Sequence, residues 1–456
     1  RSSGKTTVAL GLVAALAAEG SVVQPFKKGP DYIDPMWLAL AARRPCRNLD
    51  PHLERPEALR SAFARLAADA DLALVEGNMG LHDGLALDGS DSNAALARLL
   101  GAPVLLVLDA RGMTRGVAAL VLGLQAFDRA VCIGGVVLNR VGGARHEAKL
   151  RAAIERYTEL PVLGAIADDE RLALGERHLG LVPCAEVDAA QAQVHAIGRI
   201  VAAQVDLARV REVAADAAPL AVPATAPSRA CAGRAELRIG VARDRAFGFY
   251  YADDLAALER AGAELVFIDT LHDTRLPALD GLVIGGGFPE TSLDALAANA
   301  PLRAALRQAI EGGLPTYAEC GGLMYLARSI TWQGRTAPMV GVIPGDAVLH
   351  ARAVGRGYVE LRETDAMPWT RGEGGVVQGH EFHHSSLENL DAGVRFAYRV
   401  RRGHGVDGRH DGVVLHRLLA SYVHLRHGAG AAWVPRFVDY VRGARVERAR
   451  PATLAA

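Results

Sequence analysis

The sequence predicts two α/β domains in tandem, and three observations support this prediction. At 456 residues the chain exceeds the size at which a single hydrophobic core stops growing, about 250–300 residues. Short apolar runs alternate with helical stretches in both halves. Between the halves, residues 206–236 include an Ala/Pro-rich stretch without periodicity, which is typical of a linker. We therefore place the first domain at residues 1–205 and the second at residues 237–445.

In the first half, four stretches are rich in Val, Leu and Ile on both faces and are predicted strands: residues 21–28, 71–77, 102–110 and 130–140. Two Ala/Leu/Arg-rich stretches are predicted helices: residues 92–101 and 146–158. Strands that are apolar on both faces and alternate with helices form parallel sheets covered on both sides. The second half restarts this pattern, with predicted strands at 237–244, 263–269, 280–287 and 314–320 and a helix at 253–262.

The charge balance, the apolar runs and the cysteine content argue against a nucleic-acid partner, a membrane span and a structural zinc site. The 51 Lys and Arg residues equal the 51 Asp and Glu residues, so nothing indicates a nucleic-acid partner. The longest apolar runs are strand-length and interrupted by charge, so we expect no membrane span. Five cysteines without CxxC spacing are typical of a cytoplasmic protein without structural zinc. Because the chain starts with Arg1, we expect the native start upstream. The oligomeric state stays open, a homodimer included.

The chain opens on RSSGKTT, directly before an Ala/Leu-rich stretch that is a predicted helix. A phosphate-binding loop needs a glycine where the backbone approaches the phosphates, a lysine for the outer phosphates and a Ser/Thr hydroxyl for Mg²⁺, all at a helix N-terminus. Gly4, Lys5 and Thr6 have these identities at this spacing. The opening glycine of the full pattern would precede Arg1. The alternative is an ordinary helix N-terminus with a surface lysine.

Charged side chains follow the next two strands of the predicted sheet. PFKKGPDYIDP carries the lysine pair 27–28 with Asp31 and Asp34, and LALVEGNMGLHDG carries Glu76 at a strand end and Asp83 in a glycine-rich loop. Because ligands bind at the carboxyl ends of strands in open α/β sheets, we expect these groups to converge on the phosphate loop. A carboxylate beside a lysine and a threonine suits Mg²⁺. For the three aspartates, a turn or helix-cap role is the alternative.

A cysteine between a predicted strand and a predicted helix is the second candidate site. In LPTYAECGGLMYL, the two glycines after Cys320 are typical of a nucleophile elbow, where a sharp turn presents the side chain. Backbone N–H groups of Gly286 and Gly321 are candidate oxyanion donors. The late strand LLASYVHLRHG offers His424 or His427 as the base. The alternative for a lone cysteine is a small buried hydrophobe.

Seven stretches taken together resemble the family of cobyrinate (or hydrogenobyrinate) a,c-diamide synthases: KKGPDYIDP, PCRNLD, VEGNMGLHDG, IGGGFPE, YAECGGLMYL, GHEFHHS and ASYVHL. This is a family of glutamine-dependent amidotransferases of corrinoid synthesis, and the resemblance covers nearly the whole chain in order. It implies an N-terminal P-loop domain similar to dethiobiotin synthetase, which binds ATP and the tetrapyrrole. It also implies a C-terminal class I glutamine amidotransferase domain of flavodoxin-like fold.

The resemblance implies the following chemistry. Cys320 attacks glutamine with His424 as the base, and ammonia passes to the first domain, where ATP has phosphorylated a carboxylate of the tetrapyrrole. Ammonia then displaces the phosphate and leaves an amide. The residues implied in ATP binding are Ser3, Gly4, Lys5, Thr6, Thr7 and Lys28, with Thr6 and Glu76 toward Mg²⁺. The residues implied near the activated carboxylate are Asp31, Tyr32, Asp34 and Asp83.

The chain departs from two patterns at Arg426. In the family, this position is usually the second histidine of an SYxHxH tail. In many class I amidotransferases, the residue two after the catalytic histidine is a glutamate. A Cys–His dyad or another third partner is therefore implied. The histidines of GHEFHHSSL fit a structural or substrate-facing role better than a metal site, because no Cys or Asp lies at ligand spacing.

Two other functions remain open from the sequence. Relatives of the family amidate sirohaem or nickel-sirohydrochlorin by the same chemistry, and no residue separates these substrates from cobyrinate. A nucleotide-switch or partitioning ATPase has a similar phosphate loop but would leave Cys320 and His424 without a role.

Overall fold

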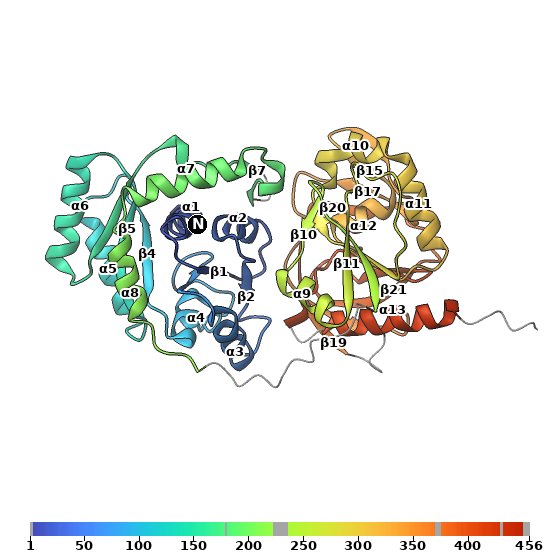
Figure 1. Ribbon diagram of the computed structural model, residues 1–456, viewed down its shortest axis with the longest axis horizontal. Coiled ribbons are helices and arrows are strands. Elements are labelled where there is room, and N and C mark those ends of the chain that lie inside the picture. The colour runs from blue at the N-terminus through green and yellow to red at the C-terminus, as the bar shows by residue number, and fades with distance from the viewer. Residues whose placement is uncertain (1–2, 178–179, 222–235, 370–374, 429–431, 450–456) are drawn as a thin grey trace, which may run out of the picture. The chain divides into compact units, whose positions relative to one another are not determined.

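The chain separates into two units, residues 1–225 and 226–456, each with its own sheets and hydrophobic core. Figure 1 presents the computed structural model, which describes residues 3–177, 180–221, 236–369, 375–428 and 432–449. Most of the linker expected from the sequence, residues 222–235, lies outside the described residues.

The described residues of the first unit form two three-stranded parallel sheets where the sequence predicts one. The first has the order β2 (Arg47–Leu49), β1 (Val23–Lys28), β3 (Leu72–Glu76), and the second the order β4 (Val104–Asp109), β5 (Ile133–Val141), β6 (Val162–Ala167). Lys27 of β1 is directly opposite Glu76 of β3. This register places their side chains on the same face, at the carboxyl ends of both strands.

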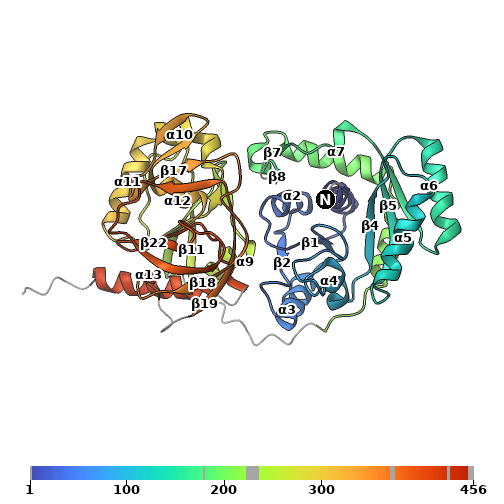
Figure 2. The same ribbon diagram turned by 180° about the vertical axis from the view of Figure 1, so that it is seen from behind.

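Helices cover these sheets: α1 (Lys5–Ala18), α2 (Ile33–Ala42), α3 (Pro56–Ala67), α4 (Asn93–Leu100), α5 (Gly116–Phe127), α6 (Ala144–Tyr157), α7 (Ala190–Ala202) and α8 (Leu207–Ala215). The hairpin β7 (Glu176–Arg177) with β8 (Gly180–Leu181) and the short 3₁₀ turns Glu170–Leu172 and Cys184–Glu186 complete the unit. Helix α1 contacts α7 and α2, and Figures 1 and 2 show it beside α2 and beneath α7. One buried cluster joins α1 to residues of both sheets, so α1 holds the unit together.

The expected linker starts too early, because α8 occupies residues that the sequence assigns to it. Leu207 and Val210 of this helix are buried in the same cluster as α1, and the Asp206 side chain accepts a hydrogen bond from the Arg209 N–H at the start of α8. The helix therefore belongs to the first unit. The Ala-rich composition that suggested a linker is equally that of a good helix.

The second unit is built on a nine-stranded sheet among its described residues, with the order β11 (Ala263–Ile268), β9 (Leu237–Ala242), β12 (Gly281–Ile284), β14 (Thr316–Glu319), β23 (Leu418–Ser421), β22 (His410–Leu415), β21 (Arg395–Arg402), β18 (Gly355–Glu363), β19 (Val376–His383). The strands from β11 to β23 are parallel, and the others are antiparallel. A four-stranded sheet has the order β16 (Arg335–Pro338), β15 (Ala327–Trp332), β17 (Ile343–Leu349), β20 (Ser385–Glu388), and β10 (Phe247–Phe249) pairs with β13 (Gly286–Gly287). The helices are α9 (Ala252–Arg260), α10 (Leu293–Ala298), α11 (Ala300–Glu311), α12 (Gly321–Leu326) and α13 (Trp433–Ala449), with a 3₁₀ turn at Pro289–Ser292.

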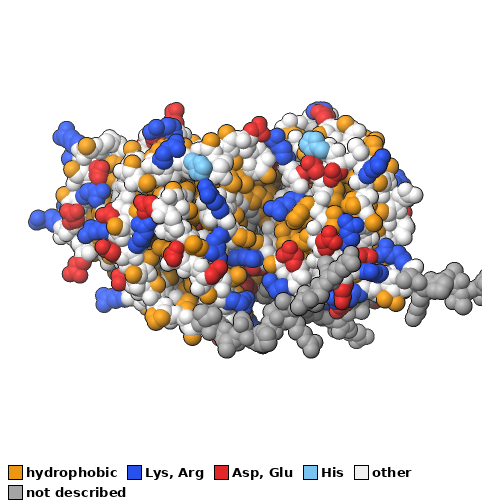
Figure 3. Space-filling model, viewed as in Figure 1, with side chains coloured by type: hydrophobic (Ala, Val, Ile, Leu, Met, Phe, Trp, Pro, Cys, Tyr) orange, Lys and Arg blue, Asp and Glu red, His pale blue; other side chains and the backbone are white. Residues whose placement is uncertain are grey.

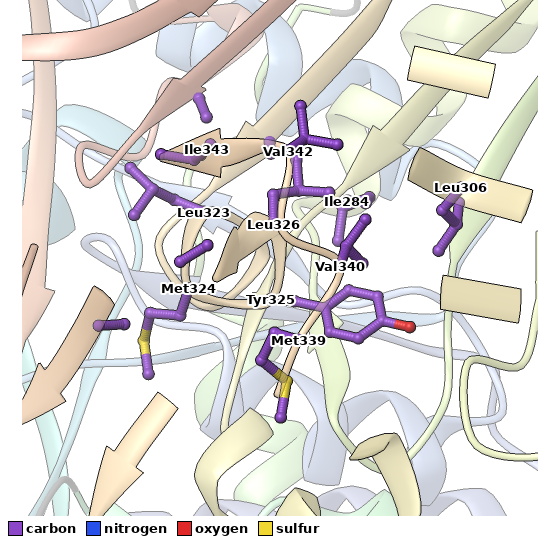
Figure 4. Packing of buried hydrophobic residues seen from close by; sticks show 14 of the residues in the cluster. Ile284, Leu306, Leu323, Met324, Tyr325, Leu326, Met339, Val340, Val342 and Ile343 are labelled. Carbon is purple, nitrogen blue, oxygen red and sulfur yellow. The ribbon is translucent and has the colours of Figure 1, made fainter. Parts of the chain in front are cut away.

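Two features of this unit position a site. The backbone of His380 in β19 exchanges two hydrogen bonds with that of His424, which brings the outermost strand back to the residues that follow β23. The helix α12 is buried along its whole length, and Figure 4 shows residues 323–326 packed with Val340, Val342 and Ile343. The residue that precedes α12 is therefore attached to a rigid element.

The surface of the described residues has mixed charge. Figure 3 shows acidic and basic side chains interspersed on the face in view. None of the described helices has the length and apolar character needed to cross a bilayer.

Candidate functional sites

The phosphate loop predicted at the start of the chain has the geometry of a helix N-terminus without a side-chain cap. Gly4 is the N-cap of α1 with φ 79° and ψ 23°, a left-handed conformation that favours glycine. A Cβ at Gly4 would lie 2.1 Å from the Asn139 side-chain nitrogen. That nitrogen donates a hydrogen bond to the Ser3 carbonyl at 2.8 Å. Asn139, at the end of β5, thus fixes the loop; sequence analysis did not identify it.

A cluster of charged side chains lies at the start of α1. The Thr6 hydroxyl donates to Glu76 Oε1 at 2.5 Å and lies 3.4 Å from Asp34 Oδ2. The Lys27 ammonium contacts both carboxylates, at 2.9 Å from Glu76 and 2.5 Å from Asp34. Its side chain is 4% exposed and that of Glu76 is 2% exposed. The predicted convergence of Thr6, Asp34 and Glu76 is therefore observed, with a buried lysine at its centre.

The electrostatics of the cluster follow from its burial. Burial raises the pKa of Glu76 to about 7, although the charge of Lys27 opposes the rise. The pKa of Lys27 is raised because the attraction of Glu76 and Asp34 outweighs the effect of burial. Burial lowers the pKa of Lys5, whose ammonium lies in the field of Glu76 and of the other cluster charges.

The residues of this cluster fit Mg²⁺. Glu76 Oε2 is buried and has no hydrogen-bond partner among the described residues. The oxygen atoms available as metal ligands belong to the Thr6 hydroxyl and to the carboxylates of Asp34 and Glu76. These are the hard oxygen ligands that Mg²⁺ binds together with water.

The remaining predicted residues lie around the cluster. The Asp31 carboxylate accepts hydrogen bonds from the N–H groups of Ile33 and Asp34, so it caps α2, and it is 4.0 Å from Lys27. Tyr32 is buried at the start of α2. The Asp83 carboxylate accepts from the Gly80 N–H at 3.0 Å, which shapes the loop after β3.

Lys28 does not join the cluster. Side chains alternate along a strand, and the Lys28 ammonium instead donates to Asn78 Oδ1 at 3.1 Å. The structure thus brings Lys27 to the predicted metal ligands, whereas the sequence suggested Lys28 for the nucleotide site. Its role in nucleotide binding stays a prediction.

We expect Lys27→Met to destabilise the first unit strongly. The substitution keeps an apolar stem of similar length but leaves Asp34 and Glu76 buried without their cation, and breaking a buried ion pair in this way costs about 3–5 kcal/mol. Thermal unfolding at pH 8 without divalent metal measures the loss. Lys28→Met is the matched control, because it removes the neighbouring lysine of the same strand, whose ammonium bonds a neutral amide. An equal loss in both variants would contradict the central role of Lys27.

The second site is built around Cys320, between β14 and α12. Its backbone has φ 47° and ψ −102°, a strained conformation for a residue other than glycine. The Cys320 N–H donates to the Ser421 carbonyl at 2.7 Å. A Cβ on Gly322 would lie 2.3 Å from the Ile284 carbonyl oxygen, so the turn needs a glycine there. This is the predicted elbow, and strain of this kind clusters at active sites.

A buried carboxylate shapes the chain that leads to His424. Asp411 is fully buried, contacts the Ser421 hydroxyl and accepts hydrogen bonds from the N–H groups of Tyr422 and Val423. The chain after β23 therefore turns so that His424 faces Cys320, to which its side chain is hydrogen-bonded. His427 lies apart, with its N–H donated to Asp254. Of the two predicted bases, the structure brings His424 to the cysteine.

The third partner of the Cys–His pair comes from an unexpected position. Glu319 directly precedes Cys320, and its Oε2 lies 3.1 Å from His424 Nδ1. Burial disfavours protonation of His424, but the hydrogen bonds to Cys320 and Glu319 outweigh this and raise its pKa to about 10. The sequence signal for this partner is the glutamate of YAECGG, which lies before the cysteine and not two residues after the histidine.

Arg426 is a cation, not a catalytic acid, and it packs against residues close to His424. It is 2% exposed, pairs with Asp253 at 3.2 Å and lies over the Tyr251 ring, with 5.4 Å from the guanidinium carbon to the ring centroid. The Tyr251 hydroxyl lies 3.3 Å from His380 Nδ1. The His380 ring stacks on that of His424 at 5.0 Å between centroids. Arg426 thus packs on Tyr251, which contacts the His380 ring that stacks on His424.

The predicted oxyanion glycines both lie close to the pair. A Cβ on Gly286 would lie 2.7 Å from His424 Cε1, and one on Gly321 would lie 3.0 Å from the backbone nitrogen and oxygen of Gly287. The N–H of the neighbouring Gly285 already donates to the Tyr250 hydroxyl at 2.8 Å. The oxyanion role of Gly286 and Gly321 stays a prediction.

Comparisons with known proteins agree with this division of the chain. Residues 2–182 match the CobQ/CobB/MinD/ParA nucleotide binding domain, and residues 238–431 match the CobB/CobQ-like glutamine amidotransferase domain. A cobyrinate a,c-diamide synthase of Magnetococcus marinus is 47% identical over 97% of this chain and 95% of its own length. One of Methanosarcina acetivorans is 39% identical over 94% of this chain and 90% of its own length.

These similarities extend over both units, and the matched domains contain the phosphate loop and the Cys–His pair. The chain belongs to the cobyrinate a,c-diamide synthase family.

Proposed function

We propose that this chain uses ATP and glutamine to amidate the a and c acetate carboxylates of cobyrinate. The proposal is carried by two different sites in one chain of this family. One is a cysteine elbow with its base, and the other is a phosphate loop beside a buried carboxylate cluster. The first releases ammonia from an amide. The second activates a carboxylate to accept it.

In the glutaminase reaction, the Cys320 sulfur attacks the amide carbon of glutamine. His424 takes the thiol proton and gives it to the leaving nitrogen, so that ammonia departs from the tetrahedral intermediate and the thioester remains. His424 then takes a proton from water as the water attacks the thioester, glutamate leaves, and the proton returns to sulfur to restore the thiol. The N–H groups of Gly286 and Gly321 are the donors that we assign to the oxyanion of both steps.

In the synthetase reaction, the residues at the start of α1 bind and orient the nucleotide. Gly4 lets the backbone approach the phosphates, and Lys5 offsets the charge of the outer ones. Thr6, Glu76 and Asp34 are the residues that would hold Mg²⁺, and Lys27 balances the carboxylates. When bound, ATP and Mg²⁺ supply the phosphoryl group and the charge neutralisation that convert a carboxylate into an acyl phosphate.

The acyl phosphate is the chemical reason for two sites. A carboxylate is a poor acyl donor because its leaving group is an oxide, whereas an acyl phosphate loses phosphate readily. Ammonia attacks the acyl carbon, phosphate leaves with the bonding electron pair, and the amide remains. We assign Asp31, Tyr32, Asp34 and Asp83 to the surroundings of this carboxylate.

A substrate panel tests the proposal. The chain is incubated with ATP, Mg²⁺ and glutamine and with cobyrinate, hydrogenobyrinate, sirohaem or nickel-sirohydrochlorin, and the products are identified by mass spectrometry. We expect a diamide from cobyrinate. Amidation of sirohaem or nickel-sirohydrochlorin alone would identify that tetrapyrrole as the substrate in place of cobyrinate. The proposed reaction through an acyl phosphate would be unchanged. ATP hydrolysis without any amide would instead favour a switch ATPase.

A further inference from the structure

The amidotransferase site needs a group that orients its histidine, and the position where class I enzymes often carry an acid holds Arg426. We propose that Glu319, the residue before the nucleophile, is the positioning carboxylate of this site. It holds His424 in the tautomer and orientation that serve Cys320. The inference rests on the proposed function only in naming glutamine as the amide that is cleaved.

Strand alternation aims Glu319 at the histidine. Residues two apart on a strand share a face, so Tyr317 and Glu319 of β14 lie on one side of the strand. The Tyr317 hydroxyl donates to Glu319 Oε1 at 2.5 Å, and the Leu425 N–H donates to the same oxygen at 2.9 Å. Oε2 is thus turned toward His424 Nδ1. Glu319 is only 6% exposed, so the carboxylate is fixed by these contacts.

This geometry decides which nitrogen of His424 faces the nucleophile. A carboxylate at Nδ1 requires the N–H on that side, which leaves Nε2 to exchange a proton with the thiol. The same carboxylate stabilises the imidazolium that forms when the proton leaves sulfur. A third hydrogen bond, to a catalytic side chain, is more than a structural carboxylate needs, since Tyr317 and Leu425 already anchor it.

The other groups around His424 do not take this role. His380 stacks on the imidazole, and its pKa is well below the usual value because of burial and of the charges of His424 and Arg426, so it is neutral. Tyr251 points its hydroxyl to His380. Arg426 carries the wrong sign and is held by Asp253. Glu319 and the Cys320 side chain are the groups that favour the charged form of His424.

Glu319→Gln tests the inference with little change of shape. The amide oxygen can still accept from Tyr317 and Leu425, while its NH₂ group meets His424 Nδ1 and favours the wrong tautomer. We expect kcat for glutamate release to fall at least about a hundredfold with little change in KM, because Glu319 does not contact the substrate. Tyr317→Phe, which removes one anchor of the carboxylate, should cost only about two- to tenfold.

A second readout follows the ion pair directly. In the parent, Cys320 should react with iodoacetamide at neutral pH, because its side chain is hydrogen-bonded to His424, which accepts the thiol proton. In Glu319→Gln the imidazolium loses its negative partner, the proton stays on sulfur, and half-maximal alkylation should move to higher pH. A purely structural glutamate would leave this profile unchanged.

The matched control is Glu381→Gln. Glu381 is also a buried glutamate of the second unit that accepts two backbone N–H groups, from His404 and Gly405, and faces a histidine, His383 at 3.6 Å. We expect this variant to keep the kinetics and the alkylation profile. Glu319→Asp, whose shorter side chain draws back from Nδ1, should recover only part of the activity.

Glutamate release within about threefold of the parent and an unshifted alkylation profile in Glu319→Gln would overturn the inference. Amidation with free ammonia should stay at the parent level in this variant, which also shows that the chain is folded. The tetrapyrrole is not a reactant in glutamate release or in alkylation. A failure of the proposed substrate and a failure of this inference are therefore distinguishable.

Discussion

Cys320→Ala should abolish amidation driven by glutamine while amidation driven by free ammonia continues. Alanine cannot form the thioester, and removal of a catalytic nucleophile typically costs about a thousandfold or more in kcat. The ammonia-driven reaction needs the phosphate loop and the carboxylate cluster, and the described contacts of that cluster join residues of the first unit. Diamide formation is measured with each nitrogen donor at saturating ATP.

Cys132→Ala provides the control for this experiment. Cys132 is an exposed free thiol of the first unit, so its loss should change neither reaction. Glutamine-driven turnover that survives in Cys320→Ala would show that another group attacks the amide. Loss of the ammonia-driven reaction as well would show that the cysteine contributes to synthesis, and the division of labour proposed here would be wrong.

Lys5→Ala should have the converse effect. The ammonium at the start of α1 is the cation that we propose for the outer phosphates, and loss of one such electrostatic donor costs about a hundredfold to a thousandfold in rate. We expect amidation to fall by this factor with either nitrogen donor, whereas glutamate release continues. Nucleotide affinity and amide formation are the two measurements.

Lys149→Ala, on the exposed face of α6, is the matched control for a lost lysine. It should bind nucleotide and amidate as the parent does. Full amidation by Lys5→Ala would contradict the phosphate-loop interpretation. The start of α1 would then be a helix N-terminus without a role in nucleotide binding.

The strands and helices were largely predictable because their patterns are local. The doubly apolar run around Leu74 and the strand–turn–helix at Cys320 both form the expected elements. The helix at Leu207–Ala215 was missed, because Ala-rich sequence supports a helix and a linker alike and only the burial of Leu207 and Val210 decides between them. The split into two parallel sheets depends on strand pairing, which a single sequence does not encode locally.

The sites were predictable where a motif carries the chemistry and not where the chemistry depends on orientation. Thr6, Glu76, Cys320 and His424 were identified from motifs, and each meets an expected partner. Lys27 and Lys28 are neighbours of the same type, and the face of β1 on which each lies decides which one reaches Glu76. Glu319 was overlooked for a similar reason, since its role depends on which way a buried strand residue points.

The turn at Cys320 also bears on how incomplete-looking amidotransferase domains are classified. With Glu319 and Cys320 adjacent in the chain, the acid and the nucleophile are inherited as one dipeptide, and only the histidine must be brought from elsewhere. A domain screened only for a glutamate after its histidine would be counted as degenerate. If the residue before its cysteine were inspected as well, the same domain would be found to have a nucleophile, a base and a carboxylate.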